Sequence, residues 1–240
     1  MRRPQWLLTD TRSISKLRFF DPAGDGFGFR NPVGKILDRT GGEDLRRFDS
    51  FAYGKGLCFG MAFASLFYFM DSVAGKSRRP LSELSLTPGL LALLCGYQLR
   101  QFRPRTIIYV VWLWLASRGG RAGRASGRLR LAGESPDPHI LCFGPSFNSR
   151  FFYCLARAHA VVPYRSEEGR VYVYDPNYPG DRRRAVELRR EGFAYDGFRS
   201  SEGWGLVLLP LSACSGEHPS KGASNRVEWA RTLREREESG

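Results

Sequence analysis

Residues 56–75 have the sequence GLCFGMAFASLFYFMDSVAG, in which apolar side chains would fall on nearly every side of a helix. Such a run is typical of a helix that is buried all round, and Gly75 stands where a glycine commonly ends one. Two further helices are expected around residues 88–101 and 106–117. We therefore predict that the first half of the chain, residues 1–117, is mainly helical.

The second half of the chain has the pattern of a β-sheet. Short runs rich in β-branched and aromatic residues, bounded by turn residues, predict strands at residues 140–143, 159–164, 170–174 and 205–209. Helices followed by strands is the order of an α+β fold. We expect one domain over residues 1–214, in which a Gly/Arg-rich loop at 118–130 joins the helical half to a sheet half at 131–214. A polar tail follows at 215–240.

The charge of the chain is strongly positive. Its 37 Lys and Arg residues, of which 32 are arginine, exceed the 24 Asp and Glu residues and give a formal net charge of +13. Such an excess is common in nucleic-acid-binding proteins, and the arginines gather at residues 118–130 and 182–190. No known nucleic-acid-binding motif accompanies them, and the first cluster has no interleaved aromatic residues to stack on bases. Nucleic acid is therefore kept as an alternative partner, beside an arginine-rich solvated surface.

Composition and apolar patterning exclude several classes of protein. With 42% hydrophobic residues the chain can bury a core, so it is not disordered throughout. The apolar stretches at residues 84–99 and 106–117 are shorter than the roughly 18 residues that suggest a membrane span. Five cysteines without a CxxC pair argue against a disulfide framework. The first ten residues lack the apolar segment of a secretory signal, so we expect a cytoplasmic protein.

Cys58 opens the apolar helix and is the candidate nucleophile. The N-terminus of a helix carries a partial positive charge and unpaired N–H groups, which stabilise a thiolate and can donate to an oxyanion. Gly56 and Gly60 lie on either side of the cysteine and would let a substrate backbone approach closely. The alternative is that Cys58 is only a small hydrophobic residue of the core.

His159 and Asp175 lie at the open end of a predicted β-hairpin, whose turn is at residues 166–169. Directly opposed residues of an antiparallel pair point to the same face. One register pairs His159 with Asp175. The next register of the same parity, which a left-handed glycine in the turn would produce, pairs His159 with Asn177 and leaves Asp175 on the diagonal. A register shifted by a single residue would instead turn Asp175 to the other face.

Three short stretches resemble the papain-like cysteine peptidases in their compact bacterial forms: GLCFGMA at residues 56–62, AHAVVPY at 158–164 and YDPNYPG at 174–180. The Asp-Pro after the second strand is similar to that of the peptidases that trim double-glycine leaders from bacteriocins. The whole pattern looks closer still to uncharacterised bacterial papain-like proteins with a C-x-G-M helix and a YDPNYPG turn. The resemblance covers about residues 25–210. It implies a papain-like fold, in which a nucleophile helix packs against an antiparallel sheet that carries the base.

The resemblance also implies the roles of the site residues. Cys58 would be the nucleophile, His159 the general base and then acid, and Asp175 the group that orients the imidazole. Papain places a glutamine six residues before its cysteine as an oxyanion donor, whereas this chain has Ala52 there. The other candidates for oxyanion stabilisation or orientation are Tyr53, Asn31 and Asn177, together with the main-chain N–H of Cys58.

The expected activity follows from these roles. Cys58 would attack an amide or thioester carbonyl, His159 would protonate the leaving group, and water would release a thioester acyl-enzyme. This predicts a cysteine hydrolase, with peptidase as the leading activity and with no cofactor. The alternatives on the same scaffold are a transamidase or acyltransferase, in which an amine replaces water, and an inactive papain-like binding protein. The arginines at residues 182–184 follow Asp175 closely and favour an acidic peptide or protein substrate.

A zinc site is an alternative use of the histidines and cysteines. His139, Cys142, Cys154 and His159 are spaced like a set of two cysteines and two histidines. The strand predicted at residues 140–143 would turn His139 and Cys142 to opposite faces, because successive side chains alternate. We therefore expect no metal at the site.

Overall fold

The part of the chain that the structure describes consists of helices followed by a sheet. The computed structural model describes residues 20–32, 56–73, 79–117, 138–145, 157–189, 192–202 and 204–215. The helices are α2 (Cys58–Val73), α3 (Pro88–Gln98), α4 (Pro104–Ser117) and the short α7 (Leu211–Ser215), with 3-10 turns η4 (Leu81–Glu83), η5 (Leu99–Phe102) and η6 (Ser200–Glu202). The strands are β1 (His139–Pro145), β2 (His159–Glu167), β3 (Arg170–Tyr174), β4 (Ala185–Arg189), β5 (Gly192–Tyr195), β6 (Phe198–Arg199) and β7 (Trp204–Pro210). The fold is α+β, as the order of the predicted elements indicates.

The strands form one sheet in the order β6-β5-β4-β3-β2-β1-β7. Each pair of neighbouring strands in this order is antiparallel. Strands β6 and β7, at the two ends of this order, contact each other, so the sheet is nearly closed. The sequence pattern predicts β1, β2, β3 and β7 but misses β4, β5 and β6. Strands β5 and β6 are only four and two residues long, and β4 has two charged residues among five, unlike the β-branched and aromatic run of β3.

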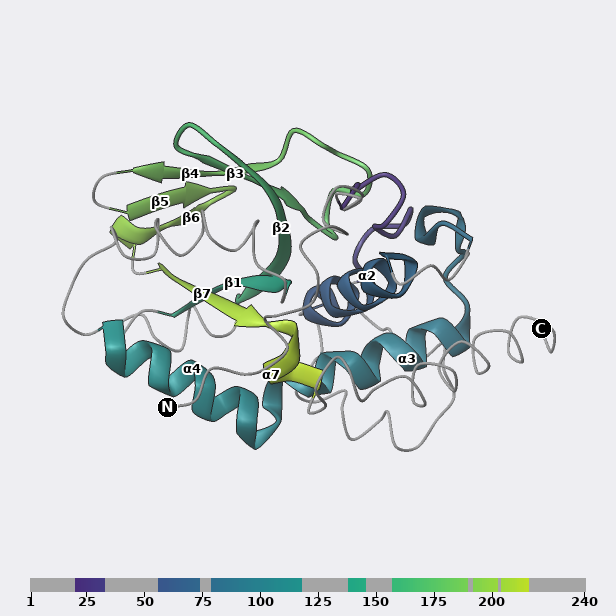
Figure 1. Cartoon of the computed structure of the whole chain (residues 1–240), viewed down its shortest axis with the longest axis horizontal. Coiled ribbons are helices and arrows are strands. Elements are labelled where there is room, and N and C mark those ends of the chain that lie inside the picture. The colour runs from purple at the N-terminus through teal and green to yellow at the C-terminus, as the bar shows by residue number, and fades with distance from the viewer. Residues whose placement is uncertain are drawn as a thin grey trace, which may run out of the picture.

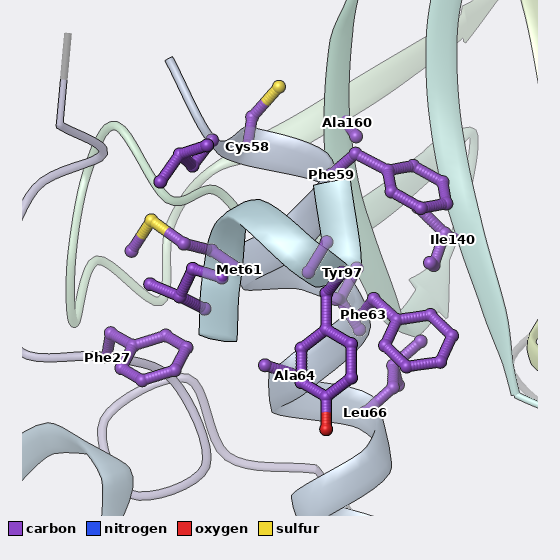
Figure 2. Close-up of a cluster of buried hydrophobic side chains, with 14 of the residues drawn as sticks. Phe27, Cys58, Phe59, Met61, Phe63, Ala64, Leu66, Tyr97, Ile140 and Ala160 are labelled. Carbon is purple, nitrogen blue, oxygen red and sulfur yellow. The ribbon is translucent and has the colours of Figure 1, made fainter. Parts of the chain in front are cut away.

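Helix α2 packs between α3 and the sheet, where it contacts β1 and β2 (Figure 1). It is buried as the sequence predicts, since Phe59, Met61 and Phe63 are each no more than 1% exposed. The close approach of the two helices depends on Gly60, because a Cβ atom at this position would collide with the carbonyl oxygen of Leu94 in α3. Figure 2 shows the resulting cluster of side chains, in which Cys58 lies at the edge with its sulfur directed away from the packed rings.

The central strands β1 and β2 are packed on both faces of the sheet. One face of β1 and β2 packs against the helices through residues that include Ile140, Ala160 and Val162. The alternate residues, Leu141, Phe143 and Val161, lie in a second core inside the curved sheet. Burial on both sides explains why β2 starts with five consecutive buried residues in place of an alternating pattern.

The hairpin of β2 and β3 contains a β-bulge. Near the turn Glu167 pairs with Arg170, whereas near the open end Pro163 pairs with Val173, so Tyr164 is the extra residue on β2. An extra residue on one strand reverses which face the rest of that strand presents to its partner. Proline cannot donate to the ladder, and bulges are among the few places where strands accommodate it.

The bulge places His159 and Asp175 on the same face of the hairpin. The register at the turn, if continued, would have turned Asp175 to the face opposite His159. The register beyond the bulge, if continued, sets His159 opposite Asn177 with Asp175 on the diagonal, which is the second of the two predicted registers. Gly169 in the turn is left-handed as expected, with φ 73°. The predicted register is therefore correct at the open end of the hairpin and wrong near the turn.

Several predictions from the sequence fall on residues that the structure does not describe. The Gly/Arg-rich loop, Tyr53, Cys154 and the tail beyond Ser215 lie outside the described ranges, and the domain boundaries stay predictions. Among the residues described, no helix combines the length and the apolar character needed to cross a membrane.

Candidate active site

Cys58, His159 and Asp175 come together where the start of α2 meets the open end of the β2–β3 hairpin. The Nε2 atom of His159 lies 2.8 Å from Oδ1 of Asp175. The Cys58 side chain is close enough to hydrogen-bond the imidazole. Because Nε2 faces the carboxylate, Nδ1 is the ring nitrogen left for the sulfur. This order of thiol, imidazole and carboxylate is the one that thiol activation requires.

Burial and pairing both act on the charges of this group. His159 is 7% exposed and Asp175 is fully buried. Burial by itself lowers the pKa of His159, but hydrogen bonds to Asp175 and Cys58 outweigh it and raise that pKa to about 10. Burial raises the pKa of Asp175, but the hydrogen bond and the charge of His159 outweigh it, so the net shift is downward. At neutral pH the pair is therefore an imidazolium and a carboxylate.

Three donors from the described part of the chain contact the Asp175 carboxylate. Its Oδ1 atom accepts from Nε2 of His159 and, at 2.7 Å, from the main-chain N–H of Asn177. Its Oδ2 atom accepts from the Tyr195 hydroxyl. Tyr195 ends β5, one of the strands that the sequence analysis misses, and no local pattern in the sequence points to it.

Asn31 joins the start of α2 to the loop that follows β3. Its Oδ1 atom accepts from the main-chain N–H of Leu57 at 2.6 Å, and its Nδ2 atom donates to Oδ1 of Asn177 at 3.1 Å. Its own main-chain N–H donates to the carbonyl of Pro176 at 2.8 Å. Asn31 and Asn177 therefore adjoin the site as orienting groups. In Asn177 the side-chain nitrogen lies 3.5 Å from Nε2 of His159.

The first N–H groups of α2 lie beside the sulfur of Cys58. The N–H of Gly60 donates to Oε1 of Gln98 at 2.7 Å, and that of Leu57 donates to Oδ1 of Asn31. The N–H groups of Cys58 and Phe59 lie between them in the first turn of the helix, where N–H groups have no partner within the helix. They are available to an oxyanion beside the sulfur.

Aromatic rings enclose the imidazole. The ring of His159 lies nearly parallel to Phe143 and Phe198, at centroid distances of 6.4 and 5.9 Å. Phe198 in turn meets Trp204 edge to face at 4.6 Å. These rings keep water from the His159–Asp175 pair, which strengthens the hydrogen bond between them.

The other described cysteines have a different environment from Cys58. Burial raises the pKa of Cys95 to about 11. Burial is also the largest cause that raises the pKa of Cys142, followed by the nearby Cys214 and Cys58. No described residue pairs a base with either thiol, and their raised pKa values keep both protonated at neutral pH.

The residues of the zinc alternative do not gather in the described part of the chain. His139 and Cys142 are on β1 at positions that face opposite sides of the sheet, and Nε2 of His159 faces Asp175. No group of three or more His, Cys, Asp or Glu side chains suited to a metal ion occurs among the described residues. Cys154, the fourth residue of the set, lies outside them.

Several arginines of the second basic cluster are paired with carboxylates of the chain itself. Arg182 binds both carboxylate oxygens of Asp21, at 2.8 and 2.7 Å. The Nη2 atom of Arg184 lies 2.9 Å from Oδ2 of Asp196. These pairs give the two arginines a structural role. Binding of nucleic acid or of an acidic substrate by this cluster stays a prediction.

The site is thus defined by its own geometry: a thiol at a helix N-terminus, a buried imidazole on the first residue of β2, and a buried carboxylate directly after β3. Asn31 and Asn177 adjoin these three residues, Tyr195 completes the carboxylate's contacts, and Tyr53 lies outside the described residues. Comparison of the chain with protein-family models, with curated proteins and with solved structures found no match.

Proposed function

We propose that this protein is a papain-like cysteine hydrolase that cleaves a peptide or related acyl substrate through a thioester acyl-enzyme. One observation carries the proposal: the buried His159–Asp175 pair lies beside Cys58, which is the first residue of α2. A cysteine that only fills the core needs no neighbouring base, and it needs no buried carboxylate to orient such a base. The antiparallel, nearly closed sheet packed on α2 supports the papain-like interpretation.

In the resting site, the proton of the Cys58 thiol passes to Nδ1 of His159, which leaves a thiolate beside an imidazolium. The elevated pKa of His159, about 10, favours this transfer, since the imidazole holds the proton throughout the neutral range. Asp175 keeps the Nε2–H in place, so Nδ1 stays directed at the sulfur.

Acylation then follows. The thiolate attacks the carbonyl carbon, and the resulting oxyanion accepts hydrogen bonds from the N–H groups at the start of α2. The carbon–nitrogen bond breaks as the imidazolium gives its Nδ1 proton to the departing amine, and the acyl group remains on sulfur as a thioester.

Deacylation restores the site. His159, now neutral, takes a proton from a water molecule, and the hydroxide attacks the thioester carbon. The carbon–sulfur bond breaks, the product leaves as a carboxylic acid, and the proton held by the imidazole again pairs with the thiolate. Asp175 stays ionised throughout and stabilises the imidazolium each time it forms.

Alkylation with iodoacetamide at pH 6 tests the activated thiolate. Ordinary thiols are almost fully protonated at this pH and react slowly, whereas a thiolate paired with an imidazolium reacts fast. Peptide mapping by mass spectrometry should find the label on Cys58 of the wild type, and His159→Ala should slow the labelling at least tenfold. Cys95→Ala is the matched control and should leave the rate unchanged. Equal labelling of all cysteines, or a rate that is the same in His159→Ala, would contradict the proposal.

The reaction itself is tested with a mixture of unstructured peptides and mass-spectrometric detection of products. Cleavage that disappears in Cys58→Ala supports the hydrolase. Addition of an amine acceptor distinguishes the acyltransferase, because amide products would then replace free carboxylic acids. A wild type with an alkylation-sensitive Cys58 that yields neither kind of product would favour the inactive binding scaffold.

A further inference from the structure

The Asp175 carboxylate is more deeply buried than any other part of the candidate site, and it depends on a hydroxyl that the triad does not include. Asp175 is fully buried, and a buried carboxylate is stable only when hydrogen bonds replace the water it has lost. Two donors, from His159 and Asn177, meet at Oδ1. On Oδ2 the donor is Tyr195.

Tyr195 is held rigidly in place. It ends β5 and precedes the turn Asp196-Gly197, in which both residues are left-handed, with φ 40° and 87°. Its ring lies against Phe143 at a centroid distance of 5.0 Å and an interplanar angle of 4°. Burial and the neighbouring charge of Asp175 raise the pKa of the Tyr195 hydroxyl, so it remains protonated and able to donate.

Arg184 supports the tyrosine from the side away from the carboxylate. Its Nε atom donates to the Tyr195 hydroxyl at 3.5 Å, and its guanidinium lies 3.8 Å from the ring centroid of Tyr178. Its Nη2 atom pairs with Asp196, which also accepts from the hydroxyl of Tyr178 at 2.9 Å. One arginine thus connects the turn after β5 with the loop between β3 and β4 that carries Asn177.

The charges therefore alternate along a continuous line of contacts. His159 is positive, Asp175 negative, Arg184 positive and Asp196 negative, and the neutral Tyr195 hydroxyl lies between the two middle members. The titratable groups that face Asp175 or this line are Cys58 from α2, His159 from β2, Tyr174 from β3, Tyr178 and Arg184 from the loop before β4, and Tyr195 and Asp196 from the β5–β6 hairpin.

We propose that Tyr195, held by Arg184, is a positioning residue that keeps the Asp175 carboxylate ionised and turned so that Oδ1 faces His159. The inference rests on the proposed function, because it assigns a role to Tyr195 only if His159 acts on Cys58. Rotation of the carboxylate would break both the contact of Oδ1 with His159 and that of Oδ2 with Tyr195. The carboxylate therefore has one stable orientation, and it holds the imidazole in one orientation as well. Without Tyr195, Oδ2 would be a buried anionic oxygen with no donor among the described residues.

The test is a titration of Asp175 by NMR on protein labelled with ¹³C at the aspartate carboxyl carbon, with Asp175→Asn to assign the signal. Tyr195→Phe removes the hydroxyl and retains the ring. Because a donor to the charged form is lost, the Asp175 titration should move upward by about one pH unit. Arg184→Gln should move the Asp175 titration upward by less. Arg184→Lys keeps the positive charge, so its Asp175 titration should stay close to that of the wild type. Tyr172→Phe and Arg183→Gln, on β3 and in the loop before β4, are matched controls and should leave it unchanged.

The second readout is the rate at which Cys58 is alkylated at pH 6. We expect this rate to fall about tenfold in Tyr195→Phe, since the imidazole is no longer fixed toward the sulfur. If Tyr195→Phe does not fold, as judged by near-ultraviolet circular dichroism, Arg184→Gln decides the question, because its side chain is partly exposed. An Asp175 titration that moves in neither variant would overturn the inference. The proposed function is tested separately. It fails if the rate of Cys58 labelling is the same in the wild type and in His159→Ala, whether or not the Asp175 titration moves.

Discussion

The Asn31 side chain donates to Oδ1 of Asn177 at 3.1 Å, and this contact links the start of α2 to the loop that follows β3. Asn31 at the same time accepts from the N–H of Leu57, the residue before the nucleophile. Asn177 contacts Asp175 through its N–H and borders the imidazole of His159. Asn31 therefore helps to hold the thiol and the base in position, together with the packing of α2 on β2, and its two amide atoms have different roles.

The two roles of Asn31 can be separated by substitution. Asn31→Ala removes both contacts and leaves the buried N–H of Leu57 unsatisfied, so we expect a loss of about 1–3 kcal/mol in the free energy of unfolding and slower alkylation of Cys58. Asn31→Asp keeps the acceptor for Leu57 and loses the donor to Asn177. It should retain most of the stability and still slow the alkylation. Urea unfolding and the alkylation rate at pH 6 are the measurements, and equal stability losses in the two variants would argue against this division of roles.

Gly60 and Gly96 form a matched pair of helical glycines for a test of the α2–α3 contact. A Cβ atom on Gly60 would collide with the carbonyl oxygen of Leu94, whereas one on Gly96 meets nothing within 4 Å. Gly96→Ala should stabilise the protein by about 0.5–1 kcal/mol, through helix propensity alone. Gly60→Ala should destabilise it by about 1–3 kcal/mol, because the helices must move apart. Urea unfolding checks both values, and a stabilised Gly60→Ala would show that the helices are not in close contact.

The main features of the fold could be predicted because they depend on local patterns. The buried helix that begins at Cys58 and the strands that begin at His159 and Arg170 are each set by periodicity and turn residues within a short stretch. The hairpin pattern also predicts that His159 and Asp175 lie close together, but from a register that holds only beyond the bulge. The bulge at Tyr164, which produces that register, is not visible in the alternation of the strand residues, because β2 begins with five consecutive buried residues. Pro163 was the one local sign of it.

The rest of the site could not be predicted because its contacts join distant parts of the chain. Tyr195 reaches Asp175 only once three short strands have curved the sheet. Asn31 meets Leu57 and Asn177 across separations of 26 and 146 residues. Neither contact leaves a spacing or a composition that can be recognised in one sequence. Arg184 likewise looks like one of a run of surface arginines until its pairing with Asp196 is known.

Alkylation of Cys95 should require a much higher pH than alkylation of Cys58. Burial raises the pKa of Cys95 to about 11, so its thiolate is scarce until the pH approaches that value. We expect Cys58 to be alkylated at pH 6 and Cys95 to react appreciably only above about pH 10. The measurement is the labelled fraction of the Cys58 peptide and of the Cys95 peptide as a function of pH. In urea the two should react at the same rate, and a Cys95 that reacts as fast as Cys58 in the native protein at pH 7 would refute the assignment.

The stability of the protein should also depend on pH through His159. The pKa of this histidine is raised from 6.5 to about 10 in the folded state, so folding favours its protonated form. The stabilisation is fully present below pH 6.5 and is lost as the pH rises through 10. A His159→Gln variant cannot titrate at this position, so the difference in free energy of unfolding between it and the wild type should shrink from pH 6 to pH 11.

Repeating the comparison in a Cys58→Ala background removes the contribution of the thiol and leaves that of Asp175. A difference that stays constant over this range would mean that the imidazole is not held as a cation, and the thiolate beside it would then lose its counter-charge.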